Sequence, residues 1–172
     1  EHKAAAMGEN PSAKRGRDAY LKSVLGYMRQ MRQRSRSSLP AAIPMASKRY
    51  NDPDAVFTKP DDPYAKGASI LHMLRERLGD DAFFAGTTNY LKAHAFSTAE
   101  SDDFRRALEA TSGQSLQRFF AQWVYRPGVP RLKVDFDWSE RDSRLEVAVE
   151  QSQTIDRLNP AFAFTLPIYV KF

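Results

Sequence analysis

Cysteine is absent from this sequence of 172 residues. That absence excludes a disulfide framework and any zinc site built from cysteine. The sequence also lacks H-E-x-x-H, the pattern whose two histidines hold a catalytic zinc ion, and it lacks the G-x-S-x-G turn of serine hydrolases. No apolar run reaches the ~18 residues that a membrane-spanning helix requires. We therefore predict no metal site within the chain and no membrane partner.

Hydrophobic residues make up 42% of the sequence and aromatic residues 12%, which is enough for a folded core. The net charge is +5, and part of the basic excess lies in residues 14–36, with Arg29, Arg32, Arg34 and Arg36 close together. Elsewhere the charges alternate in sign, as in Arg75-Glu76-Arg77. A solvated helix face explains this distribution better than a nucleic-acid interface does, so we predict no nucleic-acid partner.

Apolar residues recur at helical spacing through much of the first 126 positions, and short turns separate the repeats. Asp62 is suited to cap a helix that has Pro63 in its first position, and glycines are suited to end helices. The predicted helices run from Asp18 to about Gln33, from Pro63 to Gly79, from Asp80 or Asp81 through Leu91, from Ser97 or Ser101 to Gly113, and over residues 116–124. Short helices with short turns predict an α bundle. The proline-rich stretch 34–62 lacks this periodicity, and its length favours a functional segment.

The period of the apolar residues changes to two after Arg126-Pro127-Gly128. Alternation of this kind predicts strands of an antiparallel sheet with one buried face. The alternating apolar residues form three sets: Leu132, Val134, Phe136 and Trp138; Leu145, Val147 and Val149; and Phe162, Phe164, Leu166, Ile168, Val170 and Phe172. The predicted fold class is therefore α+β, with a helical bundle followed by an antiparallel β segment. Because three such strands need a second layer, we expect some of their apolar surface to remain exposed or to pair between chains.

The three histidines, His2, His72 and His94, do not have the i, i+4 spacing of a zinc-binding helix. The carboxylate pairs Asp80-Asp81 and Asp102-Asp103 precede predicted helices, and so does Asp61-Asp62. Helix capping explains such pairs better than acid–base catalysis does. We therefore assign no metal-binding or cofactor-binding residue.

Tyr64 is the candidate catalytic residue. A phenol in the first turn of a helix, with Gly67 three residues later, lies beside a backbone that other atoms can approach closely. Such a phenol could donate a hydrogen bond to a developing oxyanion. The alternative is that Tyr64 packs as a core aromatic residue whose hydroxyl is satisfied nearby.

The segment Tyr64-Ala-Lys-Gly-Ala68 resembles the Tyr-x-Lys-Gly-Ala motif of the aminopeptidase N-like zinc metallopeptidases. Further segments are similar to this family in the same order: Leu71-His-Met-Leu74, Leu78-Gly79-Asp-Asp81, Phe83-Phe84, Tyr90-Leu91, Phe96-Ser-Thr, Ser101-Asp-Asp103-Phe, Ser112-Gly113, Leu116, Phe119-Phe120, Gln122-Trp123-Val124 and Gly128-Val129-Pro130-Arg-Leu132. The opening Glu1-His2-Lys3 is similar to the segment shortly after the third zinc ligand of the family. The resemblance implies that residues 1–126 are the C-terminal, helical part of a thermolysin-like catalytic domain and that residues 127–172 are part of a truncated β-sandwich.

The resemblance also implies a function. The full-length parent would be a zinc-dependent aminopeptidase that hydrolyses N-terminal residues from peptides, with peptide as substrate and Tyr64 as the hydrogen-bond donor to the oxyanion. The zinc ligands would lie outside these 172 residues, so we expect no zinc bound by this chain, which would be inactive by itself. The remainder of the peptidase chain would pack on this fragment.

Two other functions compete with this one. The chain could be a non-catalytic α+β interaction module that kept the peptidase scaffold without its metal. It could also be a basic nucleic-acid-binding domain that uses Arg29 to Arg36, which a steep salt dependence of DNA binding would support. An upstream reading frame that carries H-E-x-x-H would favour the peptidase.

Overall fold

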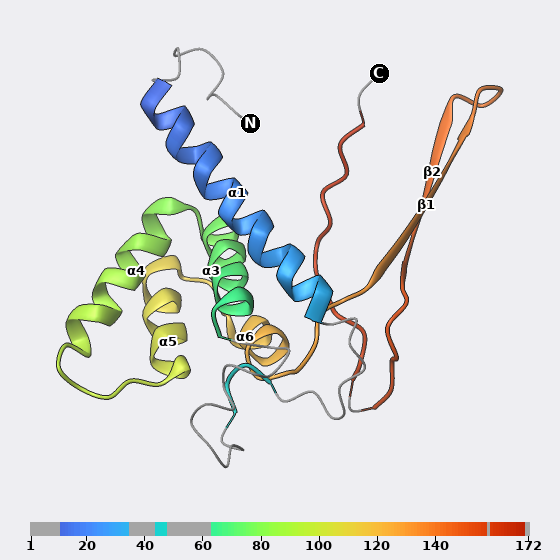
Figure 1. Cartoon of the computed structure of the whole chain (residues 1–172). Helices are drawn as coiled ribbons and strands as arrows, with labels where there is room; N and C mark the ends of the chain where they lie inside the picture. Colours follow the sequence, from blue (N-terminus) through green and yellow to red (C-terminus); the bar gives the residue numbers. More distant parts are fainter. Residues whose placement is uncertain (1–10, 35–43, 48–62, 158, 171–172) are drawn as a thin grey trace. The chain divides into compact units, whose positions relative to one another are not determined.

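The computed structural model describes residues 11–34, 44–47, 63–157 and 159–170. Within these ranges five helices are followed by two antiparallel strands (Figure 1), which confirms the predicted α+β class. The chain divides into two compact units, Glu1–Pro127 and Gly128–Phe172. That these units are parts of a catalytic domain and of a β-sandwich stays a prediction.

Helix α1 spans Pro11–Arg34 and packs against α3. The prediction that it begins at Asp18 is wrong, because Asp18 lies inside the helix. Proline is favoured at a first helical position, and one internal glycine such as Gly16 costs a long helix only about 1 kcal/mol. Val24 is buried, whereas Leu25 is half exposed, so much of the apolar face of α1 remains open to solvent.

Helices α3, Ala65–Leu78, and α4, Asp80–Ala93, follow one another with Gly79 between them. Gly79 has a φ of +79°, a conformation that glycine adopts readily, and its N–H donates to the carbonyl oxygen of Arg75 at 2.9 Å. The side chain of Arg75 then makes two hydrogen bonds to Asp80, of 2.6 and 2.8 Å. The predicted end at Gly79 and the predicted start at Asp80 are both confirmed.

Helix α5 spans Ser101–Ser112 and ends at Gly113, which has a φ of +67°. The carboxylate of Asp103 caps the helix start by accepting from the backbone N–H of Glu100 at 2.9 Å. Helix α6, Gln117–Trp123, follows a short turn in which the N–H of Leu116 donates to the side chain of Glu109 at 2.6 Å. The capping role predicted for the acidic pair Asp102-Asp103 is therefore confirmed at Asp103.

The core of the first unit forms where α3, α4, α5 and α6 present apolar side chains. Helices α4 and α5 pack side by side, and α3 contacts both α1 and α4 (Figure 1). The buried apolar residues of this unit are Val24, Ala65, Ile70, Leu74, Phe83, Leu108, Leu116, Phe119, Phe120, Trp123 and Val124. Burial of large side chains such as these supplies most of the stability of a small helical unit.

Gly86 lets α4 and α5 approach closely. A Cβ atom at this position would lie 2.7 Å from Thr111 Oγ1 and 3.1 Å from the Cα of Leu108. At Gly26 in α1 a Cβ would meet no atom within 4 Å. Helix propensity alone favours alanine over glycine at both sites.

We therefore expect opposite effects from the same substitution at these two glycines. Gly86→Ala should lower the free energy of unfolding by about 1–3 kcal/mol, because the added methyl group overpacks a helix contact. Gly26→Ala should raise it by about 0.5–1 kcal/mol, because only the unfolded chain loses freedom. Urea denaturation followed by circular dichroism measures both values. A stabilised Gly86→Ala variant would contradict the close approach of α4 and α5.

The second unit contains a β-hairpin made of β1, Leu132–Ser139, and β2, Arg144–Gln151. Val134 pairs with Val149, Phe136 with Val147 and Trp138 with Leu145, so these residues share one face of the hairpin. Phe136 is 79% exposed, and Val134, Trp138 and Val149 are also exposed. Both predicted strands are confirmed, and apolar surface on them remains exposed, as expected.

The prediction of a third strand over 162–172 is wrong for the described residues, since 159–170 contain no strand. The backbone of Phe162 instead bonds to the side-chain amide of Gln151. Its N–H donates to Gln151 Oε1 at 2.8 Å, and its carbonyl accepts from Gln151 Nε2 at 2.7 Å. Alternating apolar residues make a segment suited to a sheet, but a strand also needs a neighbouring backbone to pair with.

In the described part of the chain, no helix is both long enough and apolar enough to cross a bilayer.

Candidate functional site

Tyr64 lies immediately before α3, at the N-cap position, and not within the first turn as predicted. Its φ of −76° and ψ of −64° are already helical, and its carbonyl oxygen accepts from the N–H of Ala68 at 2.9 Å. Pro63 forms the turn that enters the helix, so it precedes the helix and does not occupy the predicted first position. The cap predicted at Asp62 lies outside the described residues.

The side chain of Tyr64 is not a core aromatic. The residue is 67% exposed, whereas the next residue, Ala65, is 1% exposed. The chain therefore turns from solvent to core within one residue at this point. A phenol in this place is accessible to a second molecule.

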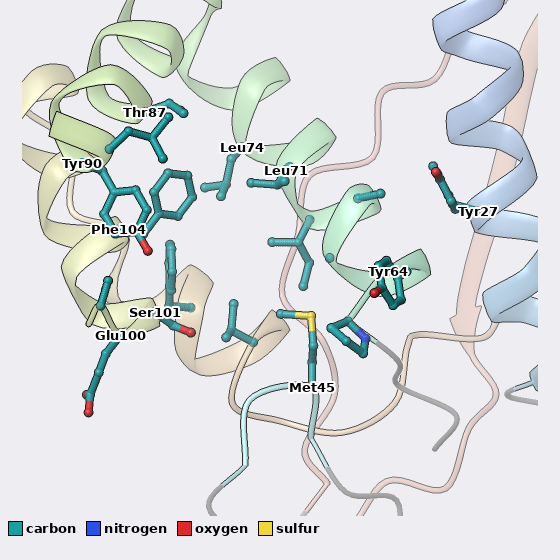
Figure 2. Close-up of a pocket in the computed structure, with 18 residues that line it drawn as sticks. Tyr27, Met45, Tyr64, Leu71, Leu74, Thr87, Tyr90, Glu100, Ser101 and Phe104 are labelled. Carbon is teal, nitrogen blue, oxygen red and sulfur yellow. The ribbon is translucent and has the colours of Figure 1, made fainter. Parts of the chain in front are cut away.

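Tyr64 borders a cavity of about 650 Å³ in the first unit. Figure 2 shows Tyr64 near Met45 on one side of this cavity, with Tyr90 of α4 and Phe104 of α5 on the other side. The lining is mostly apolar and consists of Tyr27, Met45, Pro63, Tyr64, Gly67, Ala68, Ile70, Leu71, Leu74, Thr87, Tyr90, Leu91, Ala99, Glu100, Ser101, Phe104, Phe120 and Val124. An apolar cavity with a few polar groups at its edge is typical of a binding site.

Gly67 faces Met45 in this cavity. A Cβ on Gly67 would lie 3.6 Å from Met45 Sδ, which is an ordinary van der Waals distance. The sequence predicts that other atoms approach the backbone closely at this glycine. The described neighbours leave room for a methyl group, so they do not by themselves require glycine here.

Lys66, two residues after Tyr64, is a buried charged residue that the sequence did not predict. It is 1% exposed, and its Nζ donates a hydrogen bond of 3.0 Å to the carbonyl oxygen of Arg126. Arg126 follows α6 and is half buried, and burial lowers the pKa of its guanidinium. The sequence offered one signal, a lysine at the third position of a motif that begins with Tyr64, but residue type alone predicts an exposed lysine.

The histidines serve structural contacts. His72 of α3 bonds through Nδ1 to the hydroxyl of Tyr20 at 2.9 Å, which ties α3 to α1. His94 ends α4, and its ring lies 5.3 Å from that of Tyr90. His2 lies outside the described residues. Across the described ranges, no three histidine, aspartate or glutamate side chains gather as a metal site would require.

The acidic residues near helix starts form ion pairs as well as caps. Hydrogen bonds from Arg75 lower the pKa of Asp80, and hydrogen bonds from Arg105 lower the pKa of Asp102. Arg105 bridges Asp102 and Glu109 on α5, at 2.9 and 2.6 Å. A carboxylate held ionised by arginine is poorly suited to accept a proton as a catalytic base, and these residues therefore stabilise helices. The pair Asp61-Asp62 lies outside the described residues.

The sequence is similar to a known protein family and to several known proteins. The family model described as "Peptidase family M1 domain" matches residues 6–123. The chain is 38% identical over 101 residues to Tricorn protease-interacting factor F2 of Thermoplasma volcanium, an alignment that covers 58% of this chain and 12% of that protein. It is 38% identical over 102 residues to Glutamyl aminopeptidase of Bitis rhinoceros, with coverage of 59% and 10%. It is 36% identical over 104 residues to Aminopeptidase N of Streptomyces lividans, with coverage of 58% and 12%.

The aligned segment therefore spans about a tenth of the length of these relatives. The family match ends at residue 123, at the last residue of α6. It includes Tyr64, the described cavity lining up to Phe120, and the buried apolar residues of the first unit except Val124.

Proposed function

Because the chain belongs to the family described as Peptidase family M1 domain, we propose that it contributes the oxyanion-stabilising tyrosine to a zinc-dependent aminopeptidase. The substrate would be the N-terminal end of a peptide. Relatives named as aminopeptidases support the peptidase class. In this proposal residues 1–126 form the latter, helical part of the catalytic domain, and residues 127–172 begin a β-sandwich.

The observation that carries the proposal is the position of Tyr64. The exposed phenol of Tyr64 lies at the edge of an apolar cavity, and the next residue, Ala65, is buried. Once the rest of the peptidase chain covers the cavity, a hydrogen bond made beside its apolar walls would be stronger than one made in open water, because the local dielectric constant would be lower. Tyr64 is thus suited to donate to an oxygen that gains negative charge during peptide hydrolysis.

Zinc is the cofactor that the family implies, but the described residues do not fit it. They gather no set of three ligands, and the sequence contains no H-E-x-x-H. The metal, when bound in the parent, would activate the water that attacks the peptide carbonyl. Its ligands would have to come from residues other than those described, so we assign to this chain only the donation of the hydrogen bond from Tyr64.

We further propose that the remainder of the peptidase chain packs on the first unit. Several large apolar residues are exposed on α3 and α4, among them Leu71 at 43%, Phe84 at 51% and Leu91 at 62%. Leu71 and Leu91 also line the cavity beside Tyr64. Covering such residues would exclude water from the cavity and stabilise the assembled domain.

The proposal predicts that residues 1–172 alone do not hydrolyse an aminoacyl chromogenic substrate, while a protein extended upstream through an H-E-x-x-H segment does. Activity of the extended protein should be lost with a chelator and restored with zinc. Chelator-sensitive turnover by residues 1–172 alone would contradict the proposal that the zinc ligands lie outside this chain. If the upstream sequence contains no H-E-x-x-H and the extended protein shows no turnover, the result would favour a non-catalytic interaction module.

A further inference from the structure

Lys66 is buried in a place where lysine is rarely found. It is 1% exposed and is among the largest fully buried side chains of the described residues. Lysine is almost never fully buried without polar partners, because removing its amino group from water is costly. A methionine could fill a similar volume without that cost. The amino group therefore needs an explanation beyond filling space.

The hydrogen bond of Lys66 joins two distant parts of the first unit. Its Nζ lies in reach of the Arg126 carbonyl, 60 residues later in the sequence and just beyond α6. Lys66 itself occupies the first turn of α3, two residues after Tyr64. The bond thus ties the start of α3 to the backbone that leaves α6.

At the start of α3 the side chains change from exposed to buried within one residue. Tyr64 makes no side-chain capping bond to the helix, and its side chain lies mostly in solvent. Ala65 is buried, and its carbonyl oxygen accepts a hydrogen bond from the Ser69 hydroxyl within the same helix. A side chain that is both buried and hydrogen-bonded, in the first turn, is well placed to set where Tyr64 stands.

We propose that Lys66 is a positioning residue for Tyr64. By bonding to the Arg126 carbonyl it holds the first turn of α3 at a set distance from the end of α6, and so holds the phenol at the edge of the cavity. This inference rests on the proposed role of Tyr64. Lys66 touches neither substrate nor metal in this scheme and acts only through the backbone of α3.

A kinetic double-mutant cycle in the active, upstream-extended peptidase tests the inference. Lys66→Met keeps the buried stem and removes the amino group. We expect kcat to fall by about 10- to 100-fold with little change in KM, because a shift of about 1 Å in a catalytic group can cost that much. In a Tyr64→Phe background the same substitution should cost little more, since the donor it positions is already gone.

Two matched controls separate positioning from stability. Ser69→Ala removes another buried polar group of α3, whose hydroxyl bonds to Ala65 within the same helix at 2.9 Å. Lys92→Met makes the same chemical change at an exposed position near the end of α4. Neither control should change kcat by more than about twofold, because neither alters the link between α3 and α6.

Hydrogen exchange of the same proteins, read by mass spectrometry, gives a result that does not depend on activity. Peptides that cover the start of α3 should exchange about tenfold faster in Lys66→Met, because the first turn loses its anchor. Peptides that cover α5 should be unchanged. Should Lys66→Met not fold, Lys66→Arg replaces it; the amino group then becomes a guanidinium that cannot reproduce the geometry of the bond.

The outcomes are distinguishable. If Tyr64→Phe has normal kcat, the proposed function of Tyr64 fails, whatever Lys66 does. If Tyr64→Phe is impaired but the Lys66 variant costs the same factor in both backgrounds, or leaves exchange at the start of α3 unchanged, the positioning role is overturned.

Discussion

Tyr64→Phe should lower kcat of the upstream-extended peptidase by about 10²–10³ and leave its fold intact. The substitution removes one hydroxyl and keeps the ring, so the contacts of the ring with the cavity are retained. The residue is 67% exposed, so its hydroxyl contributes little to the core. Steady-state kinetics with an aminoacyl chromogenic substrate measures the loss, and thermal denaturation checks the fold.

A matched control comes from α1. Tyr20→Phe also removes a phenol hydroxyl, but that hydroxyl bonds to His72 at 2.9 Å, and Tyr20 does not line the cavity beside Tyr64. It should reduce stability by about 1 kcal/mol and should not change kcat. Near-normal kcat in Tyr64→Phe would remove Tyr64 from the mechanism.

Leu108→Ala should lower the free energy of unfolding by about 2–5 kcal/mol. Leu108 is fully buried in α5. It lies against Gly86 of α4, at the close approach of the two helices. Truncation would leave a cavity that neighbouring side chains fill only in part. Urea denaturation of residues 1–172 alone, carrying either Leu108→Ala or Leu91→Ala, measures the difference.

Leu91→Ala is the control for that experiment, because Leu91 is 62% exposed on α4. Its truncation should change stability by no more than about 0.5 kcal/mol. Equal losses in the two variants would mean that the α4–α5 contact does not hold this unit together.

Local signals in the sequence were sufficient for much of the fold. Gly79 and Gly113 end α3 and α5 in positive-φ conformations, as expected of glycines after a helical pattern. The change of period after Gly128 marks the hairpin. These features depend on a few neighbouring residues, so they can be read without knowing what packs against them.

Other features depend on distant partners. The alternating residues from Phe162 onward have the composition of a strand, but in the described structure they pair with no strand, and the Gln151 side chain takes the backbone bonds of Phe162. Helix α1 begins at Pro11 and not at the predicted Asp18, and it continues through Gly16. Pairing and helix length are decided by cooperative contacts that a local pattern does not contain.

In the candidate site, too, some features follow from the local sequence and others depend on distant partners. The sequence by itself determined the family, the helix that ends at Gly79, and the chemistry that a phenol can offer, because motif and residue type carry that information locally. Only the tertiary structure decided that Tyr64 is exposed at a cavity, that Lys66 reaches Arg126, and that Gly86 must remain small. Each of these depends on an atom from another helix or loop, and burial is a property of the packed chain rather than of any one residue.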